Sequence, residues 1–170
     1  LLQFTYASEP RTFLFIRLIS PLHLLSGGNY WLLSIYLSFF SFAGFWILSD
    51  TLLKIYKLNV IAVLISFFIF PSVVFWSSGL IKESLVMGMF CYVLAIFINV
   101  VNRSKKRMYV PLLVSFFFCA SILLIKFYYF AVLFAVLVPY GIIKFNAVKG
   151  SLEKKSSVYR ILLFFGLLIL

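Results

Sequence analysis

Residues 18–49 contain no Asp, Glu, Lys or Arg. About 20 apolar residues are enough for a helix to cross a bilayer. The whole chain is 65% hydrophobic and 11% charged, with a mean hydropathy of +1.16, which is more apolar surface than one soluble core of this size can hide. We therefore expect an all-α fold, a polytopic transmembrane helical bundle, because helices satisfy their own backbone hydrogen bonds in lipid.

The pair Gly27-Gly28 interrupts the uncharged run and predicts two separate elements. Residues 29–49 are long enough for a membrane span. Residues 11–25 carry Arg17, Pro21 and His23. This first segment is therefore expected to be an interfacial or partly inserted helix.

Further apolar runs predict four more spans and the beginning of another, at about residues 60–76, 85–101, 109–125, 127–143 and from 161 onward. The last run contains only about half of the residues that a crossing needs, so residues 1–170 are interpreted as one transmembrane domain from a longer protein. Lys126 separates two runs with almost no loop, which favours a tight helical hairpin. One long tilted or broken helix is the alternative.

The net charge of +11 is distributed in short islands between apolar runs, unlike the continuous basic face of a nucleic-acid-binding protein. Alternating the connections places eleven of the fifteen Lys and Arg residues on one side, which predicts the cytoplasmic side. The other side receives only Arg11, Arg17, Lys82 and Lys126. The sequence therefore predicts a multi-pass integral membrane protein with membrane lipids and no nucleic acid as partners. Its richness in Phe, Ile and Lys suits an AT-rich bacterial genome, and we expect a bacterial inner (plasma) membrane as its location.

The most informative stretch is residues 70–84, where an apolar run ends at Trp76, a Ser-Ser-Gly turn follows, and Lys82-Glu83 opens the next run. Ionisable residues at membrane depth usually face water or a partner, so Lys82 and Glu83 are candidates for lining an external cavity. The alternative is a purely local role for Glu83, because an acidic residue near a helix N-terminus stabilises the helix without any further function.

Lys126 is the second candidate, since a cation beside two tyrosines can hold a phosphate as a point charge. A lysine that only extends its ammonium group to the interface is the alternative. His23 is interpreted as an interfacial structural residue. Cys91 and Cys119 lie inside apolar runs and are interpreted as packing residues, so no metal site is predicted.

Three local patterns together resemble the GT-C superfamily of membrane glycosyltransferases, in its protein O-mannosyltransferase and aminoarabinose-transferase branch. The first is residues 24–31, LLSGGNYW, which resemble an apolar segment ending in Gly before a polar-aromatic step. The second is Pro71, followed by the Ser-Ser-Gly turn and then Glu83, where the family more often has Asp. The third is Lys126, which is followed by an aromatic residue.

The resemblance implies a GT-C-like fold and transfer of a sugar, on the non-cytoplasmic face, from a polyprenyl-phosphate carrier to a hydroxyl of a glycan, lipid or protein acceptor. Glu83 and Glu9 are then the candidate catalytic carboxylates, unless the main base lies outside this sequence. Lys126, Lys82 and Arg17 are the candidate partners of the phosphate. The residues identify no particular cofactor, and such a site is compatible with a divalent cation.

Two other classes of protein remain open. The first is a polysaccharide polymerase or a transporter-like component of envelope glycan assembly, which would also place cations and aromatic residues on the outer face. The second is a non-enzymatic membrane scaffold. In a scaffold Lys82, Glu83 and Lys126 would serve topology alone.

Overall fold

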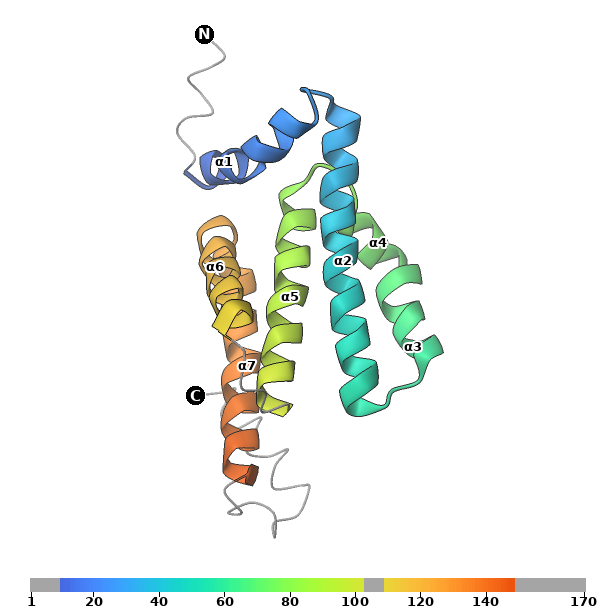
Figure 1. Cartoon of the computed structure of the whole chain (residues 1–170), viewed down its shortest axis with the longest axis vertical. Coiled ribbons are helices and arrows are strands. Elements are labelled where there is room, and N and C mark those ends of the chain that lie inside the picture. The colour runs from blue at the N-terminus through green and yellow to red at the C-terminus, as the bar shows by residue number, and fades with distance from the viewer. Residues whose placement is uncertain (1–9, 103–108, 149–170) are drawn as a thin grey trace.

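The computed structural model describes residues 10–102 and 109–148, and within these ranges the chain is helical and has no strand. The all-α class is therefore confirmed for the described part. Figure 1 shows a row of long helices that run roughly parallel to one another, with a shorter helix lying across one end of the row.

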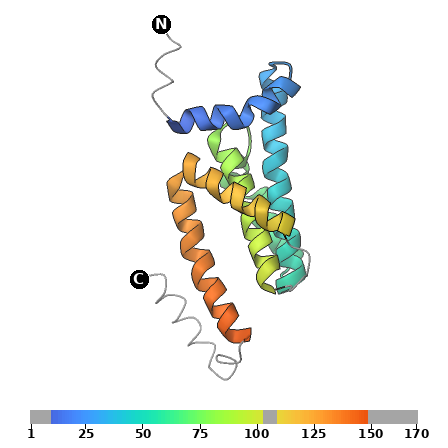
Figure 2. The same ribbon diagram turned by 60° about the vertical axis from the view of Figure 1, so that its left-hand side comes forward.

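The crosswise helix is α1 (Pro10–Leu25), and it is followed by a tight turn into α2 (Tyr30–Tyr56). Gly27 and Gly28 adopt positive φ angles of 59° and 81°, which glycine reaches without steric cost. Asn29 then caps α2, because its side chain accepts a hydrogen bond from the backbone N–H of Trp31 at 3.0 Å. The break predicted at the glycine pair is confirmed. Figure 2 shows α1 lying across the ends of the helices, and its location at a membrane interface stays a prediction.

The centre of the bundle is the close pair formed by α2 and α5 (Lys82–Asn102). Gly44 and Gly88 face each other so closely that a Cβ atom on Gly44 would lie 2.7 Å from the carbonyl oxygen of Gly88. Small residues at a helix interface let two backbones approach, which is how helices commonly associate in membranes. Ser41 and Ala95 extend this interface and are fully buried.

The predicted element at residues 60–76 is not one straight helix. It consists of α3 (Val60–Leu64), a π-helical turn η2 (Ile65–Ile69) and α4 (Pro71–Ser77), with a bend of 51° at the break. Pro71 has no backbone N–H and disfavours a helical Phe70, so the helix stops and restarts at this point. The element is therefore either a broken span or a re-entrant segment.

Two further helices, α6 (Tyr109–Ile125) and α7 (Phe127–Val148), meet at Lys126, which is itself outside both helices. They diverge from this turn, as Figure 2 shows, with α6 running obliquely over α5 and α7 returning along the bundle. The chain here forms a hairpin of two diverging helices and not one long helix.

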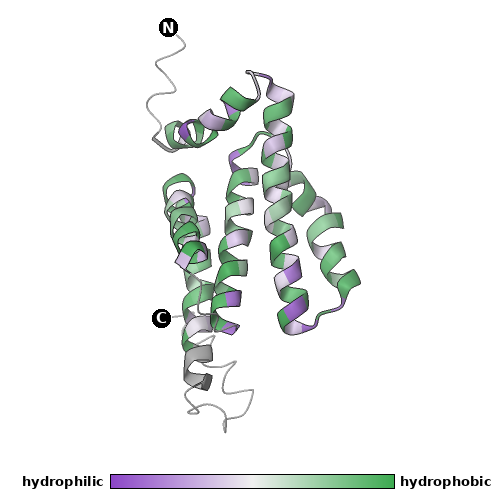
Figure 3. Cartoon of the chain, viewed as in Figure 1, coloured by the Kyte–Doolittle hydropathy of each residue, from purple (hydrophilic) through white to green (hydrophobic). Residues whose placement is uncertain are grey.

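Polar residues gather at the two ends of the bundle, and Figure 3 shows an apolar belt between them. One end contains Glu83 and Lys126, whereas Asp50 and Lys54 lie at the opposite end of α2. In the described ranges, α2 and α5 are long and apolar enough to cross a membrane, and the bent pair formed by α3–η2 and α4 would be a third span. At 1.5 Å per residue, α5 is about 31 Å long, close to the hydrocarbon thickness of a bilayer. The helix α6 is apolar but shorter, as is the part of α7 from Phe127 to Ile142.

Candidate functional site

Glu83 and Lys126, the two residues that the sequence singles out most strongly, meet at one end of the bundle. The ammonium Nζ of Lys126 lies 2.6 Å from Oε1 of Glu83, and both side chains are about one-fifth exposed, at 22% and 21%. The same ammonium group donates to the hydroxyl of Tyr128 at 2.9 Å and lies 5.3 Å from the centre of its ring. The site is therefore a partly exposed charged pair flanked by a tyrosine.

Local sequence explains how the two charges come together. Gly79, with a φ angle of 85°, makes the turn after α4, and its N–H donates to the hydroxyl of Ser38 at 2.9 Å. Ser84 is fully buried and donates to the carbonyl oxygen of Ser77 at 3.0 Å, which fixes the first turn of α5. Glu83 consequently lies at the N-terminus of α5, where a carboxylate interacts favourably with the helix dipole.

The turn between α6 and α7 presents Lys126 to this carboxylate. The backbone N–H of Lys126 donates to the carbonyl oxygen of Ile122 at 2.8 Å. The lysine therefore continues the hydrogen bonding of α6 before the chain reverses. Its hydrogen bond to Glu83 raises the pKa of the Lys126 ammonium group above the usual value, and the bond to Tyr128 adds to this effect. Lys126 is therefore held in its charged form.

The other candidate cations lie on or beside α1. Lys82 donates from Nζ to the hydroxyl of Thr12 at 2.8 Å, which ties the start of α5 to α1. Arg17 is exposed and lines a cavity of about 280 Å³ between α1 and α6, together with Ser121. Lys82 is therefore adjacent to Glu83 in sequence but binds Thr12. Arg17 lines a separate cavity.

Glu9, the second candidate carboxylate, lies outside the described residues, as does the predicted span from residue 161. His23 lies at the end of α1 and lines a cavity of about 340 Å³ with residues of α1, α2 and the turn before α5.

Larger cavities lie away from the charged pair. A cavity of about 1040 Å³ is lined by α5, α6 and α7, and another of about 490 Å³ lies between α2 and the bent segment formed by η2 and α4. Neither is lined by Glu83 or Lys126. Over residues 10–102 and 109–148, no three His, Cys, Asp or Glu side chains are grouped in a way that could hold a metal ion.

Sequence reasoning missed two features. Thr12 received no role, yet it binds Lys82, and a hydroxyl in the first turn of an interfacial helix gives no sequence signal for such a contact. A second polar cluster at the opposite end of the bundle was also missed. There the hydroxyls of Tyr56 and Tyr140 are hydrogen-bonded, and Asn102 donates to Tyr140 at 3.1 Å. These three residues come from α2, α5 and α7, so only the fold brings them together.

No protein-family model, curated protein or solved structure matches this chain. The resemblance to GT-C glycosyltransferases stays a prediction from the sequence.

Proposed function

We propose that this chain belongs to a multi-pass membrane glycosyltransferase that moves a sugar from a polyprenyl-phosphate carrier to an acceptor hydroxyl on the non-cytoplasmic side. The observation that carries the proposal is the meeting of Glu83 and Lys126, from distant parts of the chain, at the bundle end opposite Lys54 and Lys57. A carboxylate and an ammonium group next to each other are the two charges that this reaction uses. Their one-fifth exposure leaves both groups accessible to a substrate from water.

The reaction exchanges two bonds at the anomeric carbon of the sugar. The acceptor hydroxyl gives its proton to a carboxylate, its oxygen forms a bond to the anomeric carbon, and the bond from that carbon to the phosphate oxygen breaks. The electron pair leaves with the polyprenyl phosphate, whose added negative charge needs a fixed cation in a site with little water. Lys126 has this role in the proposal. Glu83, or Glu9 and residues beyond this sequence, would accept the proton.

The ion pair holds Glu83 and Lys126 in place before a substrate binds. In the absence of substrate, Lys126 neutralises Glu83 and donates to Tyr128. A phosphate that approaches Lys126 competes with Glu83 for the ammonium group, and this competition releases the carboxylate to accept a proton. The Tyr128 hydroxyl can donate its own proton to the same phosphate, since it accepts the hydrogen bond from Lys126.

The experiment measures release of polyprenyl phosphate by the full-length protein in membrane vesicles, with polyprenyl-linked sugars extracted from the membranes of its own host as donors. Glu83→Gln and Lys126→Met should each lower turnover at least 100-fold, the order expected for loss of an acid–base or charge-stabilising group. The matched control is Lys54→Met, which removes an exposed lysine that pairs with Asp50 at the opposite end of α2. Normal turnover in both variants, with normal insertion, would refute the proposal.

A non-enzymatic scaffold is the second candidate, and one observation favours it. The two charges satisfy each other at 2.6 Å, which is what a pair that only joins α5 to the hairpin turn requires. A scaffold predicts that assembly of the membrane complex is lost with the ion pair and is restored by any pair of opposite charges at the same positions.

A further inference from the structure

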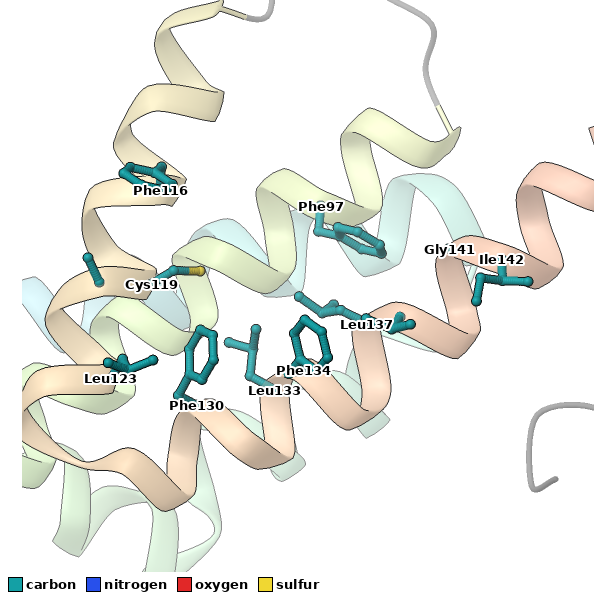
Figure 4. Close-up of a pocket in the computed structure, with 12 residues that line it drawn as sticks. Phe97, Phe116, Cys119, Leu123, Phe130, Leu133, Phe134, Leu137, Gly141 and Ile142 are labelled. Carbon is teal, nitrogen blue, oxygen red and sulfur yellow. The ribbon is translucent and has the colours of Figure 1, made fainter. Parts of the chain in front are cut away.

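The cavity of about 490 Å³ between α2 and the bent segment has a lining of mixed chemistry. The described residues around the larger cavity, between α5, α6 and α7, are apolar except for the thiol of Cys119, as Figure 4 shows, and such a lining favours no particular ligand. The smaller cavity instead combines serine hydroxyls with phenyl rings. Its volume lies within the range of about 300–1,000 Å³ that is typical of small-molecule sites.

The serine hydroxyls gather at one end of this cavity. Ser34 and Ser38 lie on α2, whereas Ser77 and Ser78 lie where α4 ends. Because α2 and the bent segment run in opposite directions (Figure 1), the first half of α2 lies beside the end of α4. The backbone N–H of Gly79 donates to the hydroxyl of Ser38 at 2.9 Å, which fixes this alignment.

The phenyl rings lie farther along both elements. Phe42 and Phe45 follow the serines on α2, and Phe67 and Phe68 precede them on the π-helical turn η2. The ring centroids of Phe42 and Phe68 are 5.3 Å apart, and those of Phe45 and Phe67 are 5.9 Å apart. Since α2 rises about 10 Å from Ser38 to Phe45, the lining changes from polar to aromatic along the bundle. A molecule with one polar and one apolar end fits this order.

The hydrogen bonds of the serines define what the polar end must carry. Three of the hydroxyls each donate their proton to a carbonyl oxygen three or four residues earlier in the chain: Ser38 at 2.9 Å, Ser77 at 3.2 Å and Ser78 at 3.1 Å. A serine hydroxyl has one proton and two acceptor lone pairs. A ligand therefore meets oxygen atoms that can only accept, so its polar end must donate hydrogen bonds.

We infer that this cavity binds an uncharged lipid whose polar end carries hydroxyl groups. The hydroxyl protons are donated to Ser77 and Ser78, and the hydrocarbon chain lies against the phenyl rings. The described residues that line the cavity include no Lys, Arg, His, Asp or Glu, and a phosphate or carboxylate without a partner is costly to bury. This site is independent of the enzymatic proposal, because neither Glu83 nor Lys126 lines it.

Photo-crosslinking of the full-length protein in lipid nanodiscs tests the site. Three probes share the same acyl chains, one of them carrying a diazirine, and differ only in the polar end: a diacylglycerol, its methyl ether and phosphatidic acid. The diacylglycerol donates one hydrogen bond, the ether donates none, and phosphatidic acid is charged. We expect saturable labelling within residues 34–45 or 67–78, and half-saturation by the diacylglycerol at a mole fraction about 10-fold lower than for either of the other probes.

Serine variants test the polar end separately. Ser77→Ala combined with Ser78→Ala should raise the half-saturating mole fraction of the diacylglycerol about 5-fold, because a hydrogen-bond acceptor is lost, and should leave that of the ether unchanged. The matched control is Ser66→Ala on η2. Ser66 is exposed, donates to the carbonyl oxygen of Ala62 at 2.8 Å and does not line the cavity, so this variant should bind all three probes as the wild type does.

Several outcomes would overturn the inference. Equal labelling of the wild type by the three probes would mean that the cavity takes hydrocarbon without regard to the polar end, and preference for phosphatidic acid would mean that it binds anions. Labelling that does not saturate would mean that no lipid binds there. These comparisons use the wild type alone, so they hold even if a serine variant fails to insert. An unchanged preference in the inserted double serine variant would also contradict the inference.

Discussion

Lys126, in the turn between α6 and α7, forms an ion pair at 2.6 Å with Glu83, which lies 43 residues earlier at the start of α5. Glu83→Gln and Lys126→Met should each lower the free energy of unfolding in detergent by about 1–3 kcal/mol, between the values for exposed and buried pairs. The double variant should lose less free energy of unfolding than the two single variants together, because the second substitution removes a charge that is already unpaired. Chemical unfolding of the four proteins measures this coupling; strictly additive losses would mean that the pair contributes nothing.

The pH dependence of this pair has a definite sign. The pKa of Lys126 is raised in the folded protein, chiefly by the hydrogen bond to Glu83, so its contribution to stability is complete below the pKa of an unfolded lysine, about 10.4. The contribution disappears as the pH rises through the higher folded pKa. The difference in melting temperature between the wild type and Lys126→Met should therefore be constant from pH 7 to 9 and shrink above about pH 10.4. A difference that grows with pH in that upper range would contradict this assignment.

The contact between Gly44 and Gly88 makes a prediction about packing. A Cβ atom added at Gly44 would lie 2.7 Å from a backbone oxygen of α5, which cannot move without shifting the helix. Gly44→Ala should therefore destabilise the protein by about 1–3 kcal/mol, the range for overpacking. Gly141→Ala is the matched control, since its Cβ would meet the end of the Phe97 side chain at 3.2 Å, and that side chain can rotate. Thermal unfolding of the two variants in detergent should rank Gly44→Ala as clearly less stable, and the reverse order would refute the close α2–α5 contact.

The polar cluster at the opposite end predicts unequal effects for two similar substitutions. Tyr140→Phe removes hydrogen bonds to both Tyr56 and Asn102, whereas Tyr56→Phe removes only the bond to Tyr140. At about 1 kcal/mol per hydrogen bond, we expect Tyr140→Phe to lower the free energy of unfolding roughly twice as much as Tyr56→Phe does. Denaturant titration of the wild type and the two variants measures both losses of unfolding free energy. Equal losses would show that the bond from Asn102 contributes no stability.

Much of the helical framework could be predicted from the sequence, because uncharged runs and glycine pairs are local signals. The predicted residues 109–125 coincide with α6, and the break at Gly27-Gly28 is confirmed. The split at Phe70-Pro71 was missed, since an apolar run looks the same whether its helix is straight or bent by 51°. A proline inside an apolar run is also compatible with a continuous helix, as Pro139 inside α7 shows.

The candidate site could be predicted only in part. Glu83 and Lys126 stand out because isolated charges beside apolar runs are rare, and the topology predicted from the sequence assigns both to the same side of the membrane. Their direct contact depends on the angle at which α6 crosses α5, and no local pattern encodes that angle. The hydrogen bond between Lys82 and Thr12 has the same origin, because it requires α1 to lie across the bundle end.

Exchange of the two charges tests the central claim most directly. The double variant Glu83→Lys and Lys126→Glu retains an ion pair between α5 and the hairpin turn but reverses the position of each group. We predict that the full-length variant inserts normally, regains stability relative to either single variant, and releases polyprenyl phosphate at least 100-fold more slowly than the wild type. Release at the wild-type rate by the exchanged pair would contradict the enzymatic account and leave Glu83 and Lys126 as a structural link.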